Sequence, residues 1–109
     1  NKEEAISLVG ENFVKDLSSL AVNYVVTNGA ESSYISEEGS YAEIKAKSVK
    51  AIDSNGAGDI FAGAALNKII EGDSFLNACE FGNYASSIIV QEKSPRLSID
   101  QYKKLKADY

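Results

Sequence analysis

The chain has 109 residues, enough for one small domain with a single hydrophobic core. Its formal net charge is −5, and its Lys and Arg residues form no long run, which argues against a nucleic-acid partner and a polybasic membrane anchor. The lack of histidine in the sequence excludes Ser-His-Asp catalysis and most zinc sites. Chemistry must therefore use carboxylates, hydroxyls, lysines, backbone amides or a hard metal.

The sequence predicts a cytoplasmic protein. It contains no apolar stretch long enough to span a membrane and no signal-peptide pattern. The single Cys79 cannot form an internal disulfide and lies among apolar residues, so we expect a buried thiol in a reducing compartment. The chain begins at Asn1 without a methionine, as expected for a piece of a longer protein.

The first half predicts a helix followed by strands. Residues 1–20 show helical periodicity with an interruption at Gly10. Residues 21–27 (AVNYVVT) form a near-continuous apolar run, typical of a strand buried on both faces in a parallel sheet, which Asn28-Gly29 ends. Two shorter strands are expected at residues 32–35 and 41–46, joined by a turn at Glu38-Gly39, and one more at residues 49–52.

The second half predicts three helices. The first, at residues 59–70, follows a glycine-rich turn and is rich in Ala and Gly, and Gly72-Asp73 ends it. The second runs over residues 74–92, before the only proline, Pro95. The third, at residues 98–107, is amphipathic, with Ser98 as its N-cap. This order of elements predicts an α/β fold class.

The turn D-S-N-G-A-G-D (residues 53–59) carries the candidate chemistry. Gly56 and Gly58 can adopt backbone angles that other residues avoid, so successive amides can point into one concavity. The helix that follows adds the positive end of its dipole, and together they form an anion site. Asp59 in the first helical turn could then accept a proton from a hydroxyl that attacks a bound phosphoryl group. The alternative is an ordinary glycine turn before a helix, with Asp59 stabilised by the dipole alone.

Residues 53–66 (DSNGAGDIFAGAAL) resemble the second signature of the ribokinase (PfkB) family of kinases, which reads D-T-x-G-A-G-D with small residues following. Residues 1–5 (NKEEA) look like the family's N-x-x-E motif, and residues 25–29 (VVTNG) look like its strand and T-x-G turn. The three motifs lie in the family's order. The resemblance implies that residues 1–109 form the C-terminal portion of a three-layer α/β/α domain, without the N-terminal acceptor-binding portion.

The resemblance also implies the site residues. Asp59 is the catalytic base, and Gly56, Ala57 and Gly58 form the anion hole. The remaining assignments are Thr27 and Gly29 at the ATP phosphates, Val49 and Asn83 at the adenine, Asn1 and Glu4 at Mg²⁺ through water and phosphate, and Asp53 with the backbone of Asn55 at the K⁺ that many members hold. Each has a structural alternative, such as a helix cap or a strand end.

Departures from the family pattern leave some of these points open. Ser54 replaces the common Thr, and Ser94-Pro95 stands where many members carry a glycine that shapes the cation region, which leaves K⁺ open. Residues 82–89 and the D-S-N-G-A-G-D core look especially like adenosine kinases, although similar text occurs in bacterial sugar kinases.

Three functions remain in view from the sequence. The resemblance implies that the parent protein transfers a phosphoryl group from Mg-ATP to a primary hydroxyl of a sugar or nucleoside. The second possibility is a catalytically incompetent nucleotide-binding module, and the third is a structural module with an incidental signature. The 109-residue chain alone is expected to be inactive and to associate with itself or with the missing portion, since a parallel sheet needs both faces covered.

Overall fold

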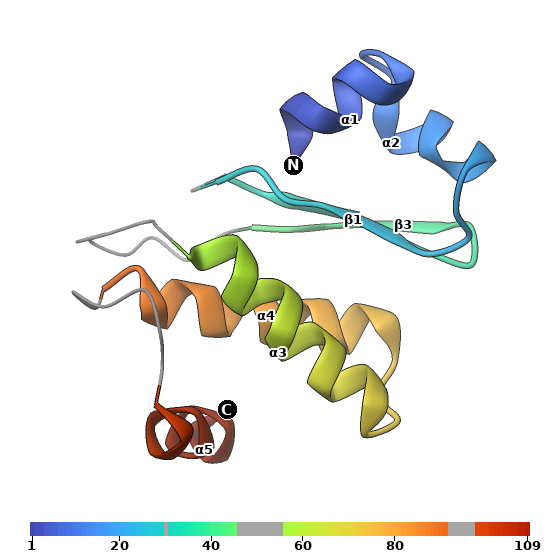
Figure 1. Cartoon of the computed structure of the whole chain (residues 1–109). Coiled ribbons are helices and arrows are strands. Elements are labelled where there is room, and N and C mark those ends of the chain that lie inside the picture. Colours follow the sequence, from blue (N-terminus) through green and yellow to red (C-terminus); the bar gives the residue numbers. More distant parts are fainter. Residues whose placement is uncertain (30, 46–55, 92–97) are drawn as a thin grey trace. The chain divides into compact units, whose positions relative to one another are not determined.

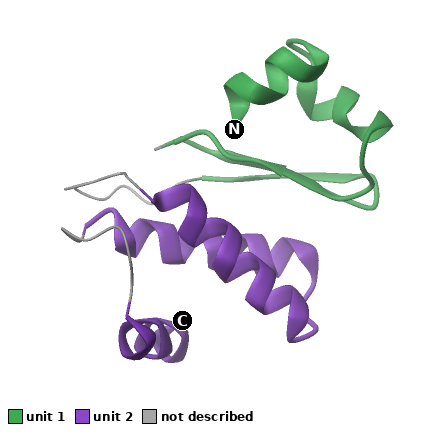
Figure 2. Cartoon of the chain, viewed as in Figure 1, with its two compact units in different colours: residues 1–46 green, residues 47–109 purple. Residues whose placement is uncertain are grey.

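The computed structural model describes residues 1–29, 31–45, 56–91 and 98–109, and these residues form two compact units. Unit 1 comprises residues 1–46 and unit 2 residues 47–109 (Figure 2). The predicted mixture of helices and strands is confirmed (Figure 1). In the described ranges, unit 1 contains both helices and strands, and unit 2 contains helices without strands. No helix in the described ranges is long and apolar enough to cross a membrane.

Unit 1 begins with the predicted helical segment. It consists of α1 (Lys2–Val9), α2 (Phe13–Asp16) and a 3₁₀ turn, η1 (Leu17–Ser19). Gly10 interrupts the helices as predicted, because it ends α1 with a φ of 97° that other residues avoid.

The strands of unit 1 are β1 (Tyr24–Val26), β2 (Ser33–Glu37) and β3 (Ser40–Ile44), which form an antiparallel sheet in the order β1-β2-β3. The predicted turn at Glu38-Gly39 is confirmed, with φ angles of 48° and 86°. Positive φ at both central residues is the backbone that matches the twist of a tight hairpin. The strand predicted at residues 49–52 lies outside the described residues.

The prediction of a long, doubly buried strand in a parallel sheet is wrong for the described strands. β1 has three residues, pairs antiparallel with β2, and leaves Val22 71% exposed. The register explains the short strand. Tyr24 lies opposite Ser36, so β2 turns away at Glu38 before it could pair with Val22. The Asn23 side chain accepts a hydrogen bond from the Glu38 amide at 2.9 Å and ends the ladder there.

The core of unit 1 joins the helices to the sheet. Buried Ala5, Phe13 and Val26 form its centre, and the rings of Phe13 and Tyr34 meet edge to face at 5.5 Å. The Tyr24 hydroxyl donates to the Val14 carbonyl, which ties β1 to α2. Burial, followed by the neighbouring Tyr41, raises the pKa of Tyr24. These contacts fix the end of β1 against the helical segment.

Unit 2 contains α3 (Ala57–Ile70), α4 (Phe75–Ile89) and α5 (Ile99–Asp108). The three predicted helices are confirmed; their ends agree within one or two residues, except that α4 ends at Ile89, three residues before the predicted end at 92. Gly72, with a φ of 99°, lies in the turn that follows α3. The Ser74 hydroxyl caps α4 by accepting a hydrogen bond from the Asn77 amide at 3.2 Å. Ser98 caps α5 as predicted, in a capping box with Gln101. Pro95 lies outside the described residues.

In the core of unit 2, small side chains pack around the ring of Phe81. Ala64, Phe81, Ala85 and Leu105 are buried together, with one or two residues from each of the three helices. Cys79 is fully buried, as predicted. Gly82 lets α4 approach α3 closely, since a Cβ atom there would lie 2.8 Å from the carbonyl oxygen of Phe61.

Candidate functional site

The N-terminus of α3 is the centre of the candidate site. Gly56 precedes the helix in the left-handed conformation, with a φ of 79°, and its carbonyl accepts the amide of Ile60 at 3.0 Å. The amides of Ala57, Gly58 and Asp59 come before this first helical bond, so the helix offers them no acceptor of its own. Free amides at the positive end of a helix dipole favour an anion, which is the arrangement that the glycine turn predicted.

Two details of this turn differ from the prediction. The helix begins at Ala57 rather than at Asp59, so Ala57 and Gly58 belong to its first turn. Gly56 alone adopts a positive φ, whereas Gly58 is helical and exposed. A Cβ atom at Gly58 would meet nothing within 4 Å. Neither the backbone angles nor the space around Gly58 in the described residues thus requires a glycine there.

Asp59 lies in the first turn of α3, as predicted, and is exposed. Its carboxylate forms no hydrogen bond or ion pair with any residue in the described ranges. A carboxylate at this position is stabilised by the helix dipole and stays available to a proton donor that approaches from solvent. Asp53 and Asn55, the predicted K⁺ ligands, and Val49, predicted at the adenine, lie outside the described residues.

A second group of predicted residues comes together in unit 1. Asn1 and Glu4 form a capping box: the Glu4 amide donates to Asn1 Oδ1 at 2.9 Å, and Glu4 Oε2 accepts from the Asn1 backbone nitrogen at 3.1 Å. The Lys2 amide donates to the Thr27 carbonyl at 2.9 Å, so the start of α1 lies beside the end of β1. The structure thus brings Asn1, Glu4 and Thr27 to one place and gives the N-x-x-E pattern a structural role as a helix cap.

The turn after β1 contains Gly29, which is exposed and has a φ of 57°. Two bonds close it: Glu31 donates its amide to the Asn28 carbonyl at 3.0 Å, and Asn28 Nδ2 donates to Glu31 Oε2 at 2.9 Å. The sequence predicted Asn28 only as the end of the apolar run and made no prediction for Glu31. An Asn and a Glu that flank a glycine turn at this spacing can form a side-chain hydrogen bond across the turn, so the sequence pattern could have indicated this contact.

Asn83 lies half-buried on α4, directly after the buried Gly82 that faces Phe61 of α3. Its carbonyl accepts a hydrogen bond from the Ser86 hydroxyl at 3.0 Å. Across the described ranges, no three Asp, Glu, Cys or His side chains gather in a group that could hold a metal ion.

Known proteins resemble this chain in sequence. The family profile described as pfkB family carbohydrate kinase matches residues 1–101. The chain is 33% identical over 100 residues to a ribokinase from Staphylococcus aureus (strain COL), a match that covers 86% of this chain and 33% of the relative. It is 34% identical over 70 residues to adenosine kinase 1 of Arabidopsis thaliana, covering 62% of this chain and 20% of the relative.

A solved structure shows the same fold. A fructokinase double mutant from Vibrio cholerae O395, bound to fructose, ADP and a potassium ion, is similar with a TM-score of 0.80 and 25% identity. The match covers 97% of this chain and 38% of the fructokinase chain. The expected ribokinase-like α/β fold is thereby confirmed. This chain spans a third or less of the two curated relatives, and its place at the C-terminal end of such proteins stays a prediction.

Proposed function

The chain belongs to the pfkB family of carbohydrate kinases, and on this premise we propose that its parent protein transfers the γ-phosphoryl group of ATP to a primary hydroxyl of a sugar or nucleoside. The observation that carries the proposal is the first turn of α3, where Asp59 stands among amides that the helix leaves unpaired. Phosphoryl transfer needs a base, a cradle for developing negative charge and little else. This turn offers both from adjacent residues.

In the proposed reaction, Asp59 accepts the proton of the acceptor hydroxyl as its oxygen attacks the γ-phosphorus. A new P–O bond forms, the bond to the β–γ bridging oxygen breaks, and ADP leaves with that electron pair. The amides of Ala57 and Gly58, with the dipole of α3, hold the charge that develops on the transferring oxygens. Gly56 supports this role because its left-handed backbone directs the chain into the helix.

The nucleotide is proposed to lie along Thr27 and Gly29, with Val49 and Asn83 at its base. The exposed turn at Gly29 supports a phosphate there, because its backbone is open to solvent. Mg²⁺ fits the exposed Glu4 carboxylate only through water and phosphate, because one carboxylate and one amide cannot fill its coordination shell. Mg²⁺ would neutralise phosphate charge when bound. Asp53 and the backbone of Asn55 are oxygen donors suited to K⁺, the ion bound in the Vibrio cholerae fructokinase structure.

The acceptor remains a choice between two classes. The matched relatives include ribokinases and adenosine kinases, and the D-S-N-G-A-G-D core favours adenosine as the specific alternative. A buried Cys79 suits activity in the reducing cytoplasm. The other candidate, a nucleotide-binding module without turnover, differs from the kinase in leaving ATP unconsumed with every acceptor.

The test is ATP consumption by the full-length parent protein over a panel of sugars and nucleosides, beside Asp59→Asn. Removal of the base should lower kcat by about a hundredfold or more. Asp100→Asn is the matched control, because Asp100 also lies in the first turn of a helix, α5, and should leave the rate unchanged.

One acceptor with strong turnover that Asp59→Asn abolishes would establish the kinase and name its substrate. Equal rates for Asp59→Asn and the parent would refute the base assignment. ATP binding without turnover on any acceptor would favour the nucleotide-binding module. The 109-residue chain assayed alone should be inactive, because the acceptor-binding portion of the family is not expected within it.

A further inference from the structure

Helix α5 presents a mixed stripe along one face. Tyr102, Leu105, Lys106 and Tyr109 recur at helical spacing, and Leu105 is buried. The Tyr109 ring lies 5.0 Å from those of Phe81 and Tyr84 on α4, between centroids. This stripe, rather than the whole polar helix, docks α5 onto the rest of unit 2.

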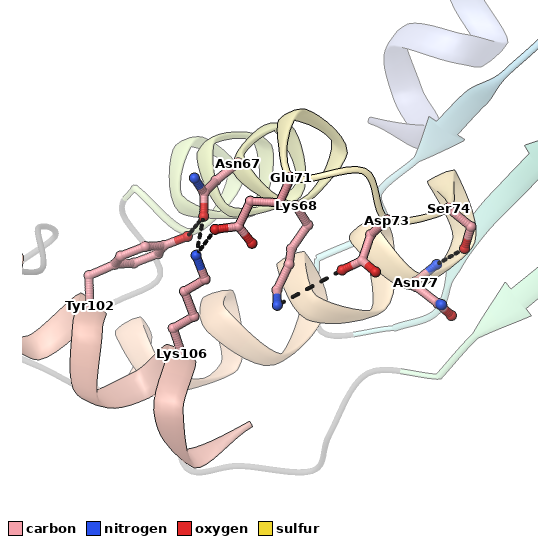
Figure 3. Close-up of polar contacts among 8 residues, drawn as sticks. All are labelled: Asn67, Lys68, Glu71, Asp73, Ser74, Asn77, Tyr102 and Lys106. Atoms are coloured by element: carbon pink, nitrogen blue, oxygen red, sulfur yellow. Dashed lines mark hydrogen bonds and ion pairs between the residues drawn. The ribbon is translucent and has the colours of Figure 1, made fainter.

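A matching stripe runs along α3. It consists of Ile60, Ala64, Asn67 and Glu71, which recur on one face of the helix. At one end, Ile60 and Ala64 pack in the cluster that contains Leu105. Towards the other end, Asn67 and Glu71 bind α5 through polar atoms (Figure 3). The two helices therefore share an apolar cluster with α4, and polar contacts join them towards the end of α3.

The polar contacts centre on Lys106. Its ammonium group donates to Asn67 Oδ1 at 3.2 Å and forms an ion pair with Glu71, and the Tyr102 hydroxyl donates to the same Asn67 oxygen at 3.0 Å (Figure 3). Two donors on one amide oxygen fix the orientation of the Asn67 side chain. Each exposed pair contributes little alone, but the shared partners make a network with a defined geometry.

The stripe on α3 begins at Ile60, the residue after Asp59. Because a helix is a stiff element, holding its Ile60, Asn67 and Glu71 positions fixes the direction in which its first-turn amides point. The corner between α3 and α4 is held separately, by the Lys68–Asp73 pair at 3.9 Å and the Ser74 cap (Figure 3). Helix α4 packs closely on α3, as at Gly82 and Phe61, and α5 adds a second support through Asn67 and Glu71.

We propose that α5 is a positioning element for the candidate site: through Lys106, Tyr102 and Leu105 it holds α3 so that Asp59 and the amides beside it keep a fixed orientation. The catalytic consequence rests on the proposed kinase function. The mechanical coupling between α5 and the first turn of α3 does not. Lys106 and Leu105 are positioning residues in this scheme, and neither needs to touch a substrate.

The test is hydrogen exchange on the full-length parent protein with Lys106→Gln, which keeps the length of the side chain and removes its charge. Loss of the ion pair should speed exchange about five- to tenfold in α5 and in the amides of residues 60–62, which close the first turn of α3. The exchange rates of the amides in strand β1 should be unchanged. Lys103→Gln is the matched control, because Lys103 is exposed on the same helix and outside the stripe, and Lys106→Arg should restore protection.

Three outcomes would overturn the proposal: faster exchange in α5 alone, faster exchange over the whole protein, or no change in Lys106→Gln. Kinetics on the same variants separate this proposal from the function. Lys106→Gln should lower kcat severalfold with little change in KM for ATP, and Lys103→Gln should not. Coupled exchange in a protein that consumes no ATP would leave the positioning role intact and refute the kinase.

Discussion

At the scale of single residues, Gly82 is the tightest position among the glycines compared in the described ranges. A Cβ atom there would lie 2.8 Å from the Phe61 carbonyl oxygen and 3.3 Å from its ring, so α3 and α4 would have to separate. We expect Gly82→Ala to lower the free energy of unfolding by about 1–3 kcal/mol, the usual cost of overpacking. Urea denaturation of the 109-residue chain measures this change.

Gly63→Ala is the matched control for that substitution. Gly63 also lies within a helix, α3, but is exposed, and a Cβ atom there would meet nothing within 4 Å. Because alanine restricts the unfolded chain and favours helix, this variant should gain about 0.5–1 kcal/mol. If both substitutions change the free energy of unfolding equally, close packing of α4 on α3 at Gly82 does not determine the cost of the Gly82→Ala substitution.

Residue by residue, the sequence predicted the local backbone around Asp59 better than the contacts that support α3. The place of Asp59 in a first helical turn follows from local spacing and is confirmed, and Gly56 has the positive φ that a glycine turn allows. The helical backbone of Gly58 was missed, because a glycine permits a left-handed turn without requiring one. The contact of Lys106 with Asn67 joins residues 39 positions apart, and no local pattern carries that information.

At the scale of elements, the docking of α5 should depend on alkaline pH. Burial raises the pKa of Tyr102, a rise that the nearby Lys106 opposes and Glu71 reinforces. Burial also raises the pKa of Tyr109, helped by the charges of Glu80 and Asp73. The docked helix therefore disfavours both phenolates. The undocked helix ionises first, near its ordinary value of about 10, so docking is fully stable below that pH and weakens as pH rises through the folded pKa values.

Hydrogen exchange of α5 against pH, followed beside tyrosinate absorbance, measures this dependence. Tyr109→Phe keeps the ring packed on Phe81 and removes one ionisable hydroxyl, so it should flatten the alkaline loss of protection. On the acid side, the hydrogen bond from Lys106 holds the pKa of Glu71 below its usual range, so that contact is lost only as pH falls through the lowered value. An alkaline profile that Tyr109→Phe leaves unchanged would contradict the role of its phenol.

The elements themselves differ in how well the sequence predicts them. The helices were predicted closely because caps and breakers mark their ends, such as Ser74, Ser98 and Gly72. The length of β1 was not, because a strand extends only as far as its partner, and β2 turns at Glu38. A strand's partner and register are tertiary facts, which an apolar run of seven residues cannot specify.

At the scale of the whole molecule, three motifs in the right order were enough to predict the family and the fold, because each motif combines a turn with a neighbouring helix or strand. The separate compactness of residues 1–46 and 47–109 was not predicted. Thr27 belongs to the first unit and Asp59 to the second. Periodicity and spacing predict helices, strands and turns from neighbouring residues. They do not predict which elements pack into the same compact unit.

The 109-residue chain leaves large apolar side chains on its surface and should associate with itself. On α3, Leu66 is 57% exposed and Ile70 is 75% exposed, and their spacing puts them on the same face. Burying a large apolar side chain at an interface contributes about 1.5–3 kcal/mol, so Leu66→Lys should weaken the association about tenfold or more. Sedimentation velocity over a range of concentrations measures it. Ala107→Lys, which adds the same charge on exposed α5 without removing a large apolar group, should leave association unchanged, and a chain that stays monomeric at every concentration would contradict the prediction.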